Sequence, residues 1–292
     1  MTAFERINPA ALLVWFLSIT VSAAVSGGAV AVGVSLIFAA ITYSLVVGKN
    51  KTHLYFFILF AALSVITPLF NHRGNTVLLV VNNVPVTLEA LICGIYNAAM
   101  VIAVIYWFRV FSLIMTDDRV LYLFGRFSKK LALVISVALR YIPLLGERTV
   151  KVRETCKVQG LYEDGNIIAR LKSEVKVFSA VTTYALEKGM ITADSMEARG
   201  YGTARRTQYT SYRFKITDAV LISASLLLCA SGVFCAAKGY VGMEFFPDII
   251  LPQFNAFSAL FNIMYFVAAA LPCLIFAKEE LKWKRLLSKL KT

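Results

Sequence analysis

The residues best suited to a chemical role lie in one polar segment near position 200. Arg199 stands between two small residues, Ala198 and Gly200, and Glu197 precedes them. The planar guanidinium of arginine can pair with a carboxylate through two parallel hydrogen bonds. Small neighbours would let the surface of a partner close around this side chain. The pattern favours Arg199 as a contact for another protein, and the alternative is an ordinary cation at a helix end.

A long helix over 167–199 is predicted to present this arginine. One apolar face recurs at spacings of three and four residues, at Ile168, Leu171, Val175, Phe178 and Thr182. Asn166 can cap the start of the helix. Gly200 and Gly202 can end it, because glycine adopts the left-handed conformation without strain.

The polar segment begins earlier, with elements that must support this helix. Residues 117–130 interleave charged and apolar side chains, which is typical of an amphipathic helix in the membrane interface. The stretch 131–145 is too interrupted to span a bilayer comfortably, since Arg140 and Pro143 lie inside it. We expect an interfacial helix that Pro143 breaks, followed by a basic helix over 146–160.

The rest of the chain is apolar. Of its 292 residues, 59% are hydrophobic and only 16% are charged, which favours an all-α membrane protein. Six stretches are long enough to cross about 30 Å of hydrocarbon as helices. They are residues 9–26, 28–48, 52–70, 87–115, 216–237 and 254–277. We expect the first to be retained rather than cleaved as a signal peptide, and Pro68 and Pro272 to bend or end their helices.

Charge predicts the orientation. Of the 30 Lys and Arg residues, only Arg73 and Lys238 fall in the predicted outer loops, so both termini are expected in the cytoplasm. The same asymmetry explains the net charge of +13, and no nucleic-acid partner is expected. The basic tail, 278–292, should form an amphipathic helix on anionic membrane lipid.

The outer loop at 71–86 predicts a small extracellular β-hairpin. Residues 76–81 are predicted to form a strand, Asn82-Asn83 suit a tight turn, and residues 84–87 can form a short return strand. Thr87 should cap the fourth span, and Glu89 is expected to complement the dipole of that helix.

Residues for catalysis or metal binding are missing. The sequence contains no phosphate-binding loop, zinc-protease motif or serine-hydrolase motif. The five cysteines lack metal spacing, and His53 and His72 read as interfacial side chains. No cofactor and no metal site are therefore expected, and the chain should not be an enzyme. The spans carry no mid-membrane charge and no repeat is evident, which weighs against a secondary transporter.

Two strings carry a resemblance to a known family: LRYIPLL at 139–145 and MEARGYG at 196–202, separated by a basic helix. Their order and spacing resemble the transmembrane (T) component of energy-coupling factor (ECF) transporters, cobalt- and vitamin-type ABC importers. The resemblance covers most of the chain, including four spans before the polar segment. It implies about six transmembrane helices with a cytoplasmic coupling-helix domain, in the plasma membrane of a prokaryote.

The resemblance implies an energy-coupling scaffold for an ATP-driven importer of a vitamin or transition-metal ion. Two ABC-type ATPase subunits would dock on two coupling helices, and a separate S component would bind the substrate. The second motif matches Ala198, Arg199 and Gly200, with Glu197, Arg140 and Pro143 supporting the domain. The first motif matches 158–160, where Gln159 stands for arginine before Gly160. We therefore expect unequal docking, with Lys157 or Arg153 as possible sources of charge at the weaker contact.

The S component should meet the apolar faces of 131–145 and 167–184. The residues implied are Leu139, Ile142, Leu171, Val175 and Phe178. The alternative is that these faces pack on the six spans. The expected domains are spans 1–4 at 1–115, the coupling domain at 116–215, spans 5–6 at 216–277 and the tail at 278–292. The runner-up function is a self-contained secondary transporter or channel, and a membrane enzyme is a third possibility.

Overall fold

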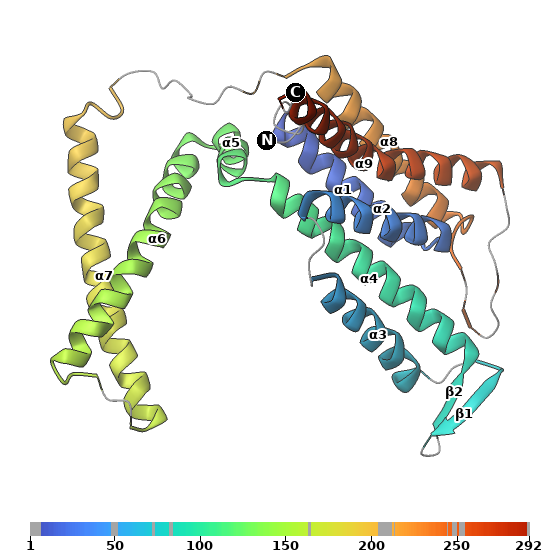
Figure 1. Ribbon diagram of the computed structural model, residues 1–292, viewed down its shortest axis with the longest axis horizontal. Helices are drawn as coiled ribbons and strands as arrows, with labels where there is room; N and C mark the ends of the chain where they lie inside the picture. Colours follow the sequence, from blue (N-terminus) through green and yellow to red (C-terminus); the bar gives the residue numbers. More distant parts are fainter. Residues whose placement is uncertain are drawn as a thin grey trace. The chain divides into compact units, whose positions relative to one another are not determined.

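The chain forms two compact units. The first comprises Met1–Asp117 and Tyr212–Thr292, and the second comprises Asp118–Ser211. The structure is a computed structural model, drawn in Figure 1. It describes residues 7–47, 52–71, 74–81, 84–162, 165–203, 212, 214–243, 245–246, 250 and 255–290.

The first unit contains six helices that are long and apolar enough to cross a membrane, counted over the residues described. They are α1 (Pro9–Ser26), α2 (Ala29–Val47), α3 (Thr52–Phe70), α4 (Leu88–Ile114), α8 (Ile216–Ala237) and α9 (Ala256–Leu290). Their positions confirm the six predicted spans. The bundle is held by packing of α1 on α8, of α2 on α4 and α9, and of α3 on α4.

Large aromatic side chains and a few polar pairs fill the centre of the bundle. Trp107 and Tyr265 are fully buried, and Trp107 Nε1 donates a hydrogen bond of 2.9 Å to Ser35 Oγ. Such contacts hold helices together in lipid, where the lipid tails are as apolar as the side chains. Small residues allow the closest approaches: a Cβ at Gly94 of α4 would lie 2.6 Å from the Ser64 carbonyl oxygen of α3.

The predicted β-hairpin is present. Strands β1 (Val77–Val81) and β2 (Val84–Thr87) pair antiparallel, and the predicted turn at 82–83 lies outside the described residues. Thr87 caps α4 as predicted, since its hydroxyl accepts a hydrogen bond from the Ala90 amide. Glu89 is buried in the first turn of α4 and accepts hydrogen bonds from the amide and hydroxyl of Thr76. The carboxylate therefore ties the hairpin to the helix, beyond its expected role at the dipole.

The end of the chain differs from the prediction. Residues 254–277 were expected to form a span that Pro272 bends or ends, with the tail as a separate helix. Pro272 does not end the helix: α9 continues through it to Leu290, over 35 residues, so the tail is not a separate helix. At a rise of 1.5 Å per residue this is about 52 Å, well beyond a hydrocarbon core of about 30 Å. The helix continues because residues 278–290 contain neither glycine nor proline.

The second unit contains α6 (Lys129–Val158), α7 (Ile167–Ala198) and all of α5 (Asp117–Phe127) except its first residue. The predicted helix break at Pro143 is wrong, because α6 continues through it for 30 residues. Proline removes one hydrogen bond to the fourth preceding carbonyl. Contacts with α7 on both sides of Pro143, at Tyr141 and Arg148, hold the helix together. The helix over 167–199 and its glycine end are confirmed.

Candidate functional site

Helices α6 and α7 cross each other as an antiparallel hairpin (Figure 1). Near the loop end, Arg153 Nε and Nη2 donate hydrogen bonds of 3.0 and 2.9 Å to the two carboxylate oxygens of Glu174. The Tyr162 hydroxyl donates a third, of 2.7 Å, to Glu174 Oε1. This cluster joins α6, the connecting loop and α7.

The charges of the cluster support one another. The pKa of Glu174 lies below its ordinary value, first because Arg153 hydrogen-bonds to the carboxylate and then because Tyr162 does. The carboxylate in turn raises the pKa of the Arg153 guanidinium and of the Tyr162 hydroxyl. All three groups therefore stay in one protonation state around neutral pH, and the loop end of the hairpin is fixed by a charge-assisted contact.

Two further contacts fix the register along the hairpin. The Arg148 guanidinium lies 4.6 Å from the ring centroid of Tyr184. The Tyr141 hydroxyl lies 2.7 Å from Thr192 Oγ1 and 3.1 Å from the Lys188 carbonyl oxygen. The buried side of α7 faces this pairing, with Ser173, Val177 and Val181.

The ends of α6 and α7 share one hydrogen-bond pattern. At the end of α6, the amides of Gly160 and Leu161 donate to the carbonyls of Lys157 and Cys156, at 3.1 and 2.9 Å. This pair of bonds defines the Schellman helix ending. Gly160 has a φ of +67°, in the left-handed region that favours glycine. Gln159 is the cap residue and is exposed.

The end of α7 repeats the pattern. The amides of Gly200 and Tyr201 donate to the carbonyls of Glu197 and Met196, at 2.8 and 3.0 Å. Gly200 has a φ of +77°, and Arg199 is the cap residue. Arg199, Glu197 and Ala198 are all exposed. The structure thus gives Gln159 and Arg199 the same backbone setting, although their side chains differ.

The two caps lie at opposite ends of the hairpin. Gln159 follows α6 and so lies beside the start of α7, whereas Arg199 ends α7. Helix α7 has 32 residues and is therefore about 48 Å long. The Gln159 and Arg199 contacts cannot share one small binding pocket, and each would meet a different part of a partner.

The charges expected to compensate for Gln159 are already engaged. Arg153 pairs with Glu174, and Lys157 Nζ lies 4.9 Å from the ring centroid of Tyr162. Arg153 joins α6 to α7, and Lys157 lies against the loop residue Tyr162. The cap residue Gln159 is itself neutral, in contrast to the cationic cap residue Arg199.

The predicted contact residues for the S component form an exposed face. Phe178 is 72% exposed, and Leu171, Val175 and Ile142 are exposed as well, whereas Leu139 is half-buried. The supporting residues Arg140 and Pro143 are also exposed. Within the described residues, the apolar face of α7 is thus left uncovered, and its opposite side packs on α6.

Sequence reasoning missed the residues that close the hairpin. Arg153 and Glu174 belong to different helices, so the short spacings that reveal ion pairs within one helix do not connect them. Tyr141 lies inside the LRYIPLL string, but its partner Thr192 could be found only from the register of α6 on α7.

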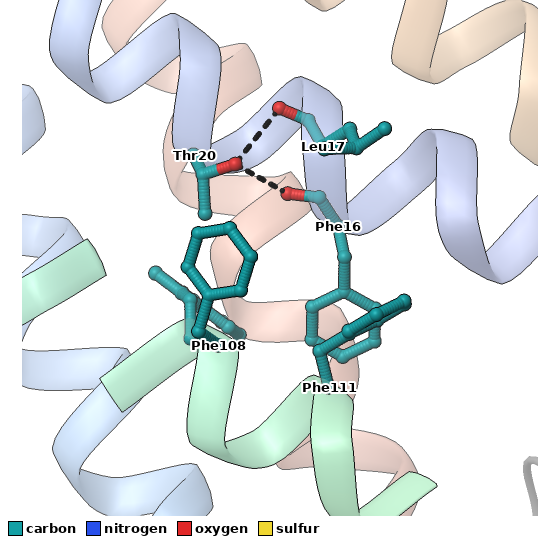
Figure 2. Close-up of a pocket in the computed structure, with 6 residues that line it drawn as sticks. Phe16, Leu17, Thr20, Phe108 and Phe111 are labelled. Carbon is teal, nitrogen blue, oxygen red and sulfur yellow. Dashed lines mark hydrogen bonds between the residues drawn. The ribbon is translucent and has the colours of Figure 1, made fainter. Parts of the chain in front are cut away.

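Other features of the described residues are packing gaps and polar contacts inside the bundle. Figure 2 shows a small cavity between α1 and α4, where the Thr20 hydroxyl donates to the carbonyls of Phe16 and Leu17. Its volume of about 20 Å³ and its apolar lining make it a packing gap. His53 bonds to Tyr106 and Ser44 within the bundle, and His72 lies outside the described residues. No group of three or more metal-binding side chains occurs in the part described.

The fold defines a multi-pass membrane protein whose candidate contact residues lie on a helical hairpin distinct from the six spans. Residues 2–210 match the family model CbiQ, described as "Cobalt transport protein". This match covers more than half of the chain, and the chain therefore belongs to the CbiQ family.

Curated relatives agree with this assignment. The chain is 33% identical over 101 residues to the energy-coupling factor transporter transmembrane protein EcfT of Lactobacillus helveticus (strain DPC 4571), covering 34% of this chain and 36% of that protein. It is 25% identical over 187 residues to EcfT of Staphylococcus aureus (strain 04-02981), covering 60% of this chain and 69% of that protein. The chain thus aligns with little more than a third of the length of the first relatives.

Proposed function

We propose that this chain is the energy-coupling scaffold of an ATP-driven importer for a micronutrient, a vitamin or a transition-metal ion. Two soluble ATPases of the ABC type dock on the ends of the α6–α7 hairpin, and a separate S component binds the substrate. The chain itself is non-catalytic. It lies in the plasma membrane of a prokaryote with both termini in the cytoplasm.

The observation that carries this proposal is the pair of equivalent exposed caps at opposite ends of the hairpin. An ATPase dimer offers two grooves, one on each subunit, and a hairpin about 48 Å long can reach both. Because the Arg153–Glu174 pair and the Tyr141–Thr192 contact hold α6 against α7, movement of one cap is passed to the other as movement of the whole hairpin.

The two docking contacts are unequal. Arg199 offers a charged fork that an acidic groove can bind through two hydrogen bonds. Gln159 offers only neutral hydrogen bonds, and the nearby cations are held within the hairpin. This asymmetry suits two different ATPase subunits. Loss of a buried charge contact costs about 2–5 kcal/mol, and loss of a neutral hydrogen bond costs about 0.5–1.5 kcal/mol.

Alanine replacements of the two caps test the docking model. Arg199→Ala should abolish co-purification of the ATPases from membranes, and Gln159→Ala should reduce it only partly. Lys176→Ala removes an exposed cation from within the first third of α7 and serves as the matched control. Equal losses from both cap variants would overturn unequal docking, and no loss from either would overturn docking at the caps.

The exposed apolar face of α7 is the proposed contact for the S component. Phe178→Glu should release the S component and leave the ATPases bound. Ile191→Glu is the control, because Ile191 is half-exposed on another side of α7. If both variants retain the S component, this face has another role.

A further inference from the structure

A second apolar feature lies within the membrane unit, between α8 and α9. It is a groove of about 560 Å³ that opens over Trp15 of α1. Its floor is buried, with Trp15 and Leu228 at 3% and 2% exposure. Its rim is open, with Val220 of α8 and Val267 of α9 at 60% and 56% exposure. The groove therefore has a closed bottom and an open side.

The groove exists because its two walls are held by different neighbours. Helix α8 packs chiefly on α1, and α9 packs chiefly on α2, so the two consecutive helices contact each other less closely. The Ser225 hydroxyl inside the groove donates to the Ile222 carbonyl at 2.8 Å. With that polar group satisfied, the groove offers an apolar surface, and its volume lies in the range of about 300–1,000 Å³ for ligand sites.

The length of the groove matches one leaflet of a bilayer. Its lining on α8 extends from Ile216 to Leu228, which is about 18 Å along a helix. Half of the hydrocarbon core is about 15 Å. An extended acyl chain from one leaflet therefore fits along the wall of α8, starting at the first residue of that helix.

Cations mark the same end of the groove. Lys215 immediately precedes Ile216, and it is exposed. On α9 the lining residues Met264, Ala268 and Leu271 continue at helical spacing to Lys278 and Lys282, which are also exposed. Because α9 is unbroken to Leu290, these residues lie along one side of the helix, from the apolar wall of the groove to Lys278 and Lys282.

We propose that the groove binds one anionic phospholipid of the leaflet at the basic end of the bundle. One acyl chain lies between α8 and α9 over Trp15, and the phosphate lies among Lys215, Lys278 and Lys282. The apolar wall accounts for the chain, and the three cations account for the negative headgroup. This site depends on the membrane spans alone and not on the proposed coupling function.

A transmembrane helix of a partner is the other occupant to consider. The groove favours a lipid because exposed lysines follow its apolar lining along both walls, Lys215 on α8 and Lys278 and Lys282 on α9. A single lipid molecule carries both an apolar chain and a negative phosphate in that order. A lipid-exposed partner helix would not need the three lysines.

Native mass spectrometry of the purified full chain tests the site. The protein is titrated with phosphatidylglycerol and, separately, with phosphatidylcholine of the same chains. One phosphatidylglycerol should bind with clear preference. Lys282→Gln should weaken its binding about five-fold, the effect of removing about 1 kcal/mol of attraction per lysine. Lys238→Gln removes the same charge at the opposite end of α8, where Lys238 is exposed, and should leave binding within about two-fold.

Filling the groove tests the position of the acyl chain. Val267→Trp and Val220→Trp narrow it from its two walls, and each should abolish the preferred binding. Gel filtration and circular dichroism identify a variant that has misfolded. Lipid binding is then measured on the variant in the other wall. Equal binding of the two lipids, equal effects of Lys282→Gln and Lys238→Gln, or lipid retained by both folded tryptophan variants would each overturn the site. So would loss of a co-purifying membrane protein from the tryptophan variants without any change in lipid binding.

Discussion

Gln159 and Arg199 occupy the same cap position in two helix ends that share one hydrogen-bond pattern. Each is followed by a glycine with positive φ, and each is exposed. The side chains at the two caps differ in what they can offer a partner. A long hairpin with one neutral and one cationic tip is well suited to two soluble subunits that are similar in fold and different in detail.

The glycine after Gln159 should be required for this geometry. Gly160→Ala forces a Cβ into the left-handed region, which costs about 1–2 kcal/mol. A Cβ there would meet no atom within 4 Å, so backbone strain is the whole effect. Hydrogen exchange should show faster opening of the last turn of α6, with Gly160→Asn milder than Gly160→Ala. Gly146→Ala, also in open space within α6, is the control and should not accelerate exchange. Identical exchange in Gly160→Ala and the parent would refute the role of this glycine.

The ion pair that closes the hairpin should make its loop end sensitive to acid. The folded-state pKa of Glu174 is depressed, so its stabilising effect is present above the ordinary glutamate pKa of about 4.3 and is lost as pH falls through the lower folded value. Hydrogen exchange of residues 153–162, corrected for the intrinsic rate, should rise in that acidic window.

Glu174→Gln should already open this end at neutral pH and remove the acid response. Glu187→Gln, an exposed carboxylate later on α7, is the matched control and should retain the response. An unchanged acid response in Glu174→Gln would show that another group is responsible.

The close approach of α3 and α4 predicts a packing defect. A Cβ at position 94 would lie 2.6 Å from the Ser64 carbonyl oxygen and 3.2 Å from Pro68 Cδ. Because backbone cannot move aside cheaply, Gly94→Ala should destabilise the fold by about 1–3 kcal/mol. Thermal unfolding in detergent should show a lower midpoint. Gly33→Ala in α2, where no atom lies within 4 Å, should match or exceed the parent. Equal midpoints for the two variants would mean that α3 can shift away from α4.

The elements that sequence could predict are those set by local pattern. The six spans follow from the lengths of the apolar runs, and the end of α7 follows from Gly200 and Gly202. The errors came from proline. Pro143 was expected to break a helix that contacts with α7 preserve, and a separate tail helix was expected where α9 continues through Pro272 to Leu290. The Arg153–Glu174 pair could not be predicted, because it depends on how two helices pack in space.

The central claim is that both tips of the hairpin are held by soluble ATPases, and photo-crosslinking in native membranes tests it most directly. A photoreactive amino acid at Val158 or Ala198, next to the two caps and exposed, leaves Gln159 and Arg199 intact. Each position should crosslink to an ATPase subunit, and the two subunits should differ. A probe at Val77 in strand β1, which is also exposed, should not crosslink to an ATPase subunit. Crosslinks from Val158 and Ala198 to this chain or to lipid only would contradict the central claim.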